Sequence, residues 1–94
     1  MGAEVVRLRA VVHGRVQMVG FRAFVMHHAG DAGLSGTVRN EPDGTVETVL
    51  EGPRPDVERL LELLRQGPSH ARVEHVDVEY TAPTGTLPAM MVAR

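Results

Sequence analysis

A glycine-bounded stretch near the N-terminus of this chain carries residues suited to binding an anion. It reads His13-Gly14-Arg15-Val16-Gln17-Met18-Val19-Gly20-Phe21-Arg22. Two glycines let the backbone turn tightly, so that successive N–H groups converge on one oxyanion. Arg22 lies at the start of a predicted helix, where the helix end adds partial positive charge and the planar guanidinium matches phosphoryl oxygens. The chemistry predicted for this stretch is phosphate binding.

Hydrophobic periodicity predicts the elements on either side of this stretch. Apolar residues alternate over 5–12, which is typical of a half-buried strand. An amphipathic helix leaves the stretch and ends at Gly33, and the residues expected on its apolar side are Phe21, Phe24, Val25, His28 and Ala32. Residues 35–40 and 45–51 are predicted to form a hairpin, because the intervening Glu41-Pro42-Asp43-Gly44 favours a tight turn. The anion-binding stretch therefore connects a strand to a helix.

The second half of the chain predicts one further helix and two further strands. The helix extends between Pro53 and Gly67, and both ends carry helix-limiting residues. Its apolar stripe comprises Val57, Leu60, Leu61 and Leu64. A strand over 73–80 is expected to bend near His75, where the apolar alternation changes phase, and a short last strand covers 90–92.

This order of strands and helices is that of the split βαβ arrangement. We therefore predict an α+β fold, a ferredoxin-like α/β sandwich (βαββαβ). In this fold an antiparallel sheet is covered on one face by two helices, and a short extra C-terminal strand extends the sheet edge. The loop after the first strand and the end of the second strand meet at one edge of such a sheet. We expect Arg22 and Asn40 to lie close together there.

Length and composition limit the classes of function. A chain of 94 residues is expected to form a single domain over 1–94, with one core and a shallow site. The chain contains no cysteine, which excludes disulfides, thiolate metal sites and cysteine-nucleophile phosphatases and favours a cytoplasmic location. The formal net charge is −2, so phosphate recognition is expected to be local rather than a property of the whole surface.

Signals for membrane insertion, export or self-association are not evident in the sequence. No apolar run approaches the ~20 residues of a membrane span, and Met1 to Glu4 lead directly into the first predicted strand. No large unexplained apolar face is predicted either. We expect a monomer without a membrane partner.

Three short motifs together resemble the acylphosphatase family. Residues 14–22 read GRVQMVGFR, residues 36–40 read GTVRN and residues 43–47 read DGTVE, whereas the family pattern is GxVQGVGFR, GxVxN and DGxVE. The likeness continues to the end of the chain. Several motifs in the same order and at the same spacing as in the family identify it far more specifically than one glycine-rich loop does. The resemblance implies the ferredoxin-like fold described above.

The resemblance also implies how the site works. The phosphate is bound by Arg22 and by the backbone amides of Arg15, Val16, Gln17, Met18, Val19 and Gly20. Asn40 holds the attacking water, and Arg22 and Asn40 are the catalytic residues. An asparagine suits this role because it offers a donor and an acceptor without a strongly basic group. The implied activity is hydrolysis of the carboxyl-phosphate bond of small acyl phosphates.

The leaving group of an acyl phosphate is a carboxylate of low pKa. No general acid is needed to protonate it, and the enzyme's task is to position the water and to stabilise charge on the phosphoryl oxygens. We therefore expect neither a metal nor a cofactor.

Met18 departs from the family pattern, which has glycine at this position. If the position requires a positive φ, methionine is strained by about 1 kcal/mol or more. If φ is negative, the side chain projects outward and contacts the acyl part of the substrate. The residue type alone leaves both alternatives open.

Other polar residues have simpler interpretations. Gln17 is expected to stabilise its loop by hydrogen bonding, and His13 is read as a strand end near the site. His27, His28 and Asp31 suggest a metal site, but adjacent histidines diverge by about 100° on a helix, which disfavours one shared ion. Arginine at a helix start and asparagine before a turn are each usually structural, and only their paired motifs favour catalysis.

Two other classes of function remain open. The fold also serves as a non-catalytic binding or accessory module, including acylphosphatase-like domains of carbamoyl-transfer proteins, and fold alone does not decide between the two. A ribonucleoprotein-type RNA binder shares the element order but needs exposed aromatics on its central strands. This chain has only Phe21, Phe24 and Tyr80, two of them on a helix, so no nucleic-acid partner is expected.

Overall fold

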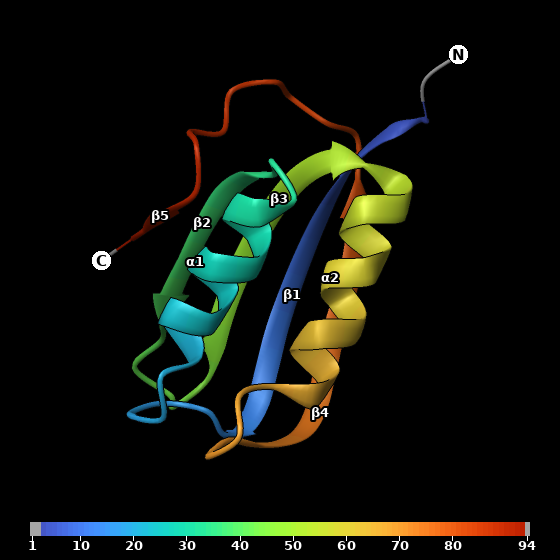
Figure 1. The fold of residues 1–94 in the computed structure, drawn as a ribbon. Coiled ribbons are helices and arrows are strands. Elements are labelled where there is room, and N and C mark those ends of the chain that lie inside the picture. The colour runs from blue at the N-terminus through green and yellow to red at the C-terminus, as the bar shows by residue number, and fades with distance from the viewer. Residues whose placement is uncertain (1–2, 94) are drawn as a thin grey trace.

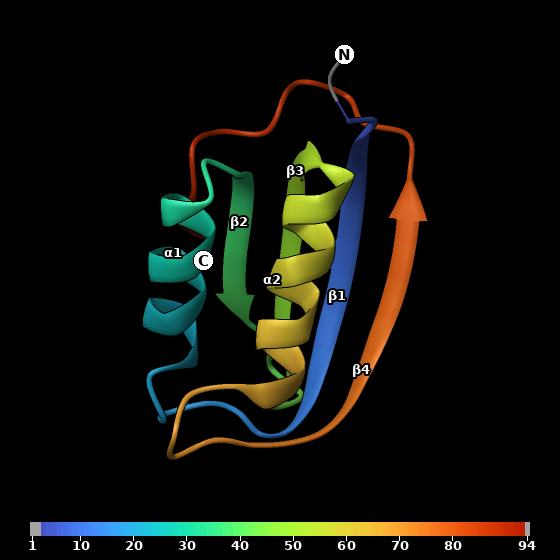
Figure 2. The same ribbon diagram turned by 45° about the vertical axis from the view of Figure 1, so that its right-hand side comes forward.

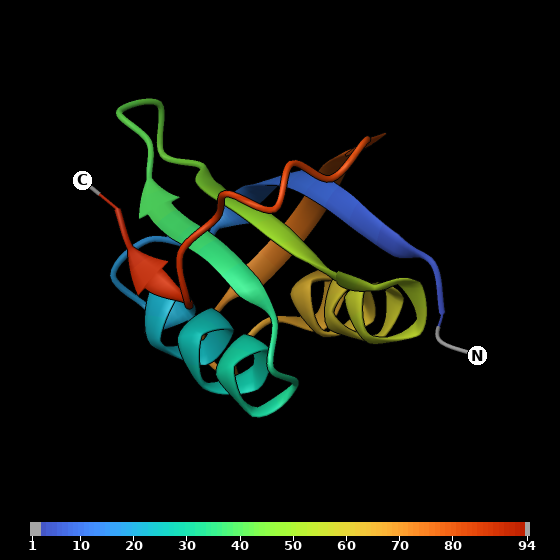
Figure 3. The ribbon, with the colours of Figure 1, turned by 90° about the horizontal axis from the view of Figure 1, so that it is seen from above.

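Two helices pack against one face of a five-stranded sheet in the computed structural model, which describes residues 3–93 (Figures 1 and 3). The elements are β1 (Val5–Arg15), α1 (Phe21–Asp31), β2 (Ser35–Asn40), β3 (Val46–Pro53), α2 (Arg54–Gln66), β4 (Arg72–Thr81) and β5 (Met91–Val92). The predicted ferredoxin-like fold is confirmed. Met1 and Gly2, from the segment in which no leader was expected, lie outside the described residues. No helix within residues 3–93 is long and apolar enough to cross a membrane.

The sheet is mixed rather than wholly antiparallel. Its strand order is β4-β1-β3-β2-β5, and β5 pairs parallel with β2 through Thr37 with Met91 and Val38 with Val92. The reason is visible in Figures 1 and 2: the chain leaves β4 at one edge, crosses one end of the sheet once, and runs back along the other edge, where Figure 1 shows β5 beside β2. A single crossing reverses the chain relative to β4, which is itself antiparallel to β1. This connection brings the last strand beside β2.

Alternating side chains of the central strands supply the core. On β1 the residues facing the helices are Val6, Leu8, Ala10 and Val12, all buried as the alternation predicts. The predicted stripe of α2 is buried against them, from Val57 to Leu64.

Helix α1 buries Phe21, Val25 and Ala29, whereas Ala32, expected on its apolar face, is exposed at the C-cap. Helix α1 ends before its next turn, so Ala32 never reaches the sheet.

A β-bulge bends the edge strand β4 at the predicted place. His13 pairs with His75 but Gly14 pairs with Val73, so Glu74 is left without a partner on β1. Gly14 has φ 127°, and a Cβ there would lie 2.1 Å from the carbonyl oxygen of Arg72. Only glycine allows this close approach. The bulge lies where β1 leads into the anion-binding stretch.

Candidate active site

The loop between β1 and α1 is held at both ends by buried side chains. Val16 is 1% exposed and Phe21 is 2% exposed, so each end of the loop is fixed in the core. Gly20 is the N-cap of α1 with φ 80°, and its carbonyl accepts the N–H of Phe24 at 3.0 Å. No side chain caps this helix start, and no acidic residue lies in its first turn. The first N–H groups of α1 and the positive helix end therefore face an uncapped space.

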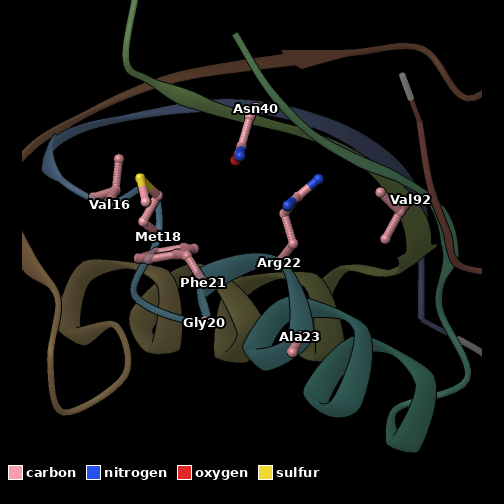
Figure 4. Close-up of a pocket in the computed structure, with 8 residues that line it drawn as sticks. All are labelled: Val16, Met18, Gly20, Phe21, Arg22, Ala23, Asn40 and Val92. Atoms are coloured by element: carbon pink, nitrogen blue, oxygen red, sulfur yellow. The ribbon is translucent and has the colours of Figure 1, made fainter.

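A pocket of about 410 Å³ opens at this helix start (Figure 4). Arg22 enters it from the first turn of α1, and Asn40 enters it from the end of β2. Figure 4 shows both side chains reaching into the space between β2 and α1, Asn40 from the strand and Arg22 from the helix. The full lining consists of Val16, Met18, Gly20, Phe21, Arg22, Ala23, Asn40 and Val92. A guanidinium and a carboxamide thus share one small space with mainly apolar walls.

The charge in this pocket is unbalanced. No carboxylate lines it, and Arg22 makes no ion pair among the described residues. By contrast, Arg9 contacts Glu47 at 2.7 Å and Arg54 contacts Glu4 at 3.0 Å. A positive charge next to an uncapped helix start attracts anions.

The other residues of the predicted phosphate loop have different positions. Val16, Met18 and Gly20 line the pocket, whereas Arg15, Gln17 and Val19 are not among its lining residues. Arg15 ends β1 opposite Arg72 and is exposed. Val19 packs against the core.

Met18 combines the positive φ of one sequence-based alternative with the outward side chain of the other. Its φ is 62°, so the backbone adopts the left-handed conformation that favours glycine. Its side chain is nevertheless 100% exposed at the pocket edge. The strain belongs to the backbone, at a cost of about 1–2 kcal/mol, and the thioether is free to meet a ligand.

Gln17 does not line the pocket, and its side chain contacts the β2–β3 turn. Its Nε2 donates to the carbonyl oxygens of Glu41 at 2.8 Å and of Thr45 at 2.9 Å. The expected hydrogen-bonding role of Gln17 is confirmed, and its partners lie in a segment remote in sequence.

Three further residues line the pocket that the sequence motifs do not indicate as site residues: Phe21, Ala23 and Val92. Phe21 is expected on the apolar side of the helix and is 2% exposed, and Ala23 follows Arg22 directly on the first helical turn. Val92 reaches the pocket only because β5 pairs parallel with β2. No local signal in the sequence indicates that pairing.

The histidines lie outside this pocket. His13 and His75 each donate a ring N–H to the carboxylate of Asp77, at 2.8 and 2.6 Å. The hydrogen bonds from His75 and then His13 lower the pKa of Asp77. His27 is 3.8 Å from Asp31, and within residues 3–93 no group of three or more His, Asp or Glu side chains is arranged to hold a metal ion.

Comparison with known proteins agrees with this geometry. The family model described as Acylphosphatase matches residues 8–88. The chain belongs to the acylphosphatase family. An acylphosphatase of Deinococcus radiodurans is 51% identical over 79 residues, which cover 84% of this chain and 91% of that relative.

Solved structures give the same result. The crystal structure of acylphosphatase from Bacillus subtilis superimposes with a TM-score of 0.91 at 31% identity, covering 95% of this chain and 99% of that one. The crystal structure of HypF from T. kodakarensis gives a TM-score of 0.81 at 33% identity over 95% of this chain, but only 12% of that chain is covered. The acylphosphatase fold therefore occurs both as a whole small protein and as a small part of a long one.

Proposed function

We propose that this protein hydrolyses the carboxyl-phosphate bond of small acyl phosphates, releasing a carboxylate and phosphate without a metal or cofactor. The observation that carries the proposal is the pairing of Arg22 with Asn40 across one pocket at an uncapped helix start. Membership of the acylphosphatase family supports the same activity.

Phosphate binding is assigned to Arg22 and the loop amides of residues 15–20. A phosphoryl group at the start of α1 meets N–H groups that no side chain caps. The guanidinium of Arg22 adds donors in a planar fork, which favours the charge that develops on the equatorial oxygens in the transition state. Because Arg22 has no competing carboxylate in the pocket, its charge is available to the substrate.

The attacking water is assigned to Asn40. The water oxygen forms a bond to phosphorus while the bond from phosphorus to the carboxyl oxygen breaks, and the electron pair of that bond leaves with the carboxylate. The water proton passes to the released phosphate or to solvent. The carboxamide orients the water without removing its proton, and orientation alone supplies a large part of the barrier reduction.

The acyl part of the substrate is assigned to the pocket mouth. Met18 is fully exposed there and Val92 is 41% exposed, so the rim offers apolar contact but no enclosure. Small acyl groups fit such a rim with little selectivity among them.

The test is release of phosphate from benzoyl phosphate in the presence of a chelator. We expect turnover above the buffer background, unchanged by the chelator, and no turnover of a phenyl phosphate monoester, whose phenolate leaving group requires a general acid. Loss of activity with the chelator contradicts the metal-independent mechanism. A folded protein without activity favours a non-catalytic module. The similarity to a small part of the T. kodakarensis HypF chain suggests this alternative.

We further propose that the protein acts as a cytoplasmic monomer without a nucleic-acid or membrane partner. The cysteine-free composition supports the location, and the formal charge of −2 argues against a nucleic-acid partner. Light scattering during size-exclusion chromatography measures the oligomeric state, and cell fractionation measures the location.

A further inference from the structure

The side-chain amide of Gln17 joins two segments that together form the pocket. One segment is the loop between β1 and α1, and the other is the turn that follows Asn40. Nε2 of Gln17 uses both of its N–H groups, one on the carbonyl of Glu41 and one on the carbonyl of Thr45. Glu41 is the next residue after Asn40. The amide therefore holds the backbone directly beside one of the two proposed catalytic residues.

We propose that Gln17 is a positioning residue, whose side chain sets the orientation of Asn40 relative to Arg22. This inference rests on the proposed function and deepens it. In the sequence, Gln17 belongs to the phosphate loop, but its side chain acts on the other half of the site.

The turn after Asn40 is internally braced, so one contact is enough to place it. Asp43 Oδ1 accepts from the backbone N–H of Thr45 at 3.0 Å and from its hydroxyl at 2.7 Å. The N–H of Glu41 donates to the carbonyl of Thr45 at 2.8 Å, and the N–H of Gly44 donates to the carbonyl of Glu41 at 3.1 Å. The turn therefore moves as a unit, and both of its carbonyls held by Gln17 move with it.

The loop side of the contact is the more firmly anchored side. Buried Val16 directly precedes Gln17, and buried Phe21 fixes the other end of the loop. The β2–β3 turn instead projects beyond the sheet, after the last strand pair of Asn40 with Val46 (Figure 3). Loss of the contact is thus expected to release the turn and Asn40 rather than the loop amides.

The chemistry of the contact requires an amide at position 17. Both acceptors are carbonyl oxygens, so the side chain must supply two donors. Methionine has a similar length and no donor. Glutamate is nearly isosteric, but its ionised carboxylate places an oxygen against two carbonyl oxygens and repels them, whereas the protonated form regains one donor.

The main test is a double-mutant cycle of Gln17→Met with Asn40→Ala. We expect Gln17→Met alone to lower kcat roughly 10- to 100-fold, because a displacement near 1 Å is enough for such a loss. KM and the Kd of inorganic phosphate should stay within about two-fold, since the loop and Arg22 remain in place. In the Asn40→Ala background, Gln17→Met should cause no further loss of kcat, because the residue it positions is gone.

A control separates positioning from general stability. Gln66→Met changes the other glutamine of the chain, which is exposed at the end of α2, and should leave kcat unchanged. If Gln17→Met lowers kcat by the same factor in the wild-type protein and in Asn40→Ala, the side chain of Gln17 only stabilises the fold. That result overturns the proposal. A wild-type kcat for Gln17→Met, or a weakened phosphate affinity with unchanged kcat, also overturns it.

Gln17→Glu adds a pH readout. We expect kcat of this variant to rise relative to wild type as the pH falls through the pKa of the new carboxyl group, because protonation restores a donor. An identical pH profile for Gln17→Glu and wild type contradicts the assigned contact.

The inference has a readout that does not depend on hydrolysis. If the wild-type protein does not cleave benzoyl phosphate, the proposed function fails, but the position of Asn40 is still measured by NMR. Gln17→Met should shift or broaden the side-chain amide signals of Asn40 and leave the Nε–H signal of Arg22 in place. Unchanged Asn40 signals overturn the inference on their own.

Discussion

The starts of the two helices differ although both helices cover the same face of the sheet. At α2, Asp56 lies in the first turn, the backbone N–H of Arg54 donates to the backbone carbonyl of Glu4 at 2.9 Å, and the Arg54 Nε donates to the Glu4 carboxylate at 3.0 Å. At α1, the first turn carries no acid, Gly20 is the N-cap, and Arg22 faces a pocket. Neither helix start has a side-chain cap, but that of α2 carries an acid and a first N–H already bonded to a backbone carbonyl, whereas that of α1 carries no acid and opens onto a pocket. The difference separates a helix that stabilises the fold from one that also presents a site.

Arg22→Ala is the strongest test of this comparison. Removal of the guanidinium should leave phosphate largely unbound and lower kcat/KM by roughly 10³-fold or more, as for other arginines that stabilise phosphoryl transfer. Steady-state turnover of benzoyl phosphate measures the effect. Arg59→Ala is the matched control on α2, where Arg59 pairs with Asp56 of the first turn at 3.3 Å and its side chain is 72% exposed. Equal losses in the two variants contradict the division between the helices.

Asn40→Ala should reduce kcat on the order of 100-fold and spare phosphate binding. The reason is that Asn40 is assigned to the water and not to the phosphate, so the ground-state complex keeps its contacts with Arg22 and the loop. Measured kcat and KM, together with the Kd of inorganic phosphate, separate the two effects. An increase in KM with unchanged kcat assigns Asn40 to substrate binding instead.

Leu64→Ala tests the stabilising role of α2. Leu64 is fully buried in the stripe of this helix, and its truncation leaves a cavity in the core. The free energy of unfolding in urea should fall by roughly 2–5 kcal/mol, while kcat of the folded fraction stays at the wild-type value. Glu62→Ala, on the exposed side of the same helix, is the control and should change stability little. A large loss of kcat at full folding would show that α2 also supports the site.

The contrast between α2, which stabilises the fold, and the site at α1 also explains which features were predictable from the sequence. The β1 alternation and the α2 stripe are strong periodic signals, because each reflects burial of one face, and both elements were placed correctly. The bulge was also predictable, since Val73 is out of phase with Val76. The end of α1 was harder, because its weaker pattern let Ala32 stand for the buried Ala29.

Contacts between remote segments were not predictable. Val92 lines the pocket through a parallel pairing that depends on the path of residues 82–90, which no local pattern specifies. The partners of Gln17 likewise depend on where the β2–β3 turn lies in space. The motifs therefore indicate which residues belong to the site, but the surrounding contacts follow from tertiary structure.

Met18→Gly is expected to have the smallest effect and sharpens the comparison at the entrance to α1. The left-handed backbone at Met18 costs about 1–2 kcal/mol, which glycine relieves. Glycine also makes the unfolded chain more flexible, which offsets about 0.4–1 kcal/mol of that gain. The free energy of unfolding should therefore rise by a few tenths to about 1 kcal/mol, as measured by urea denaturation. Met18→Ala is the matched control, since it removes the exposed side chain but keeps the strained backbone and should show no such gain. A gain in both variants assigns the effect to the exposed thioether, whereas a gain in neither shows that the loop relaxes without cost.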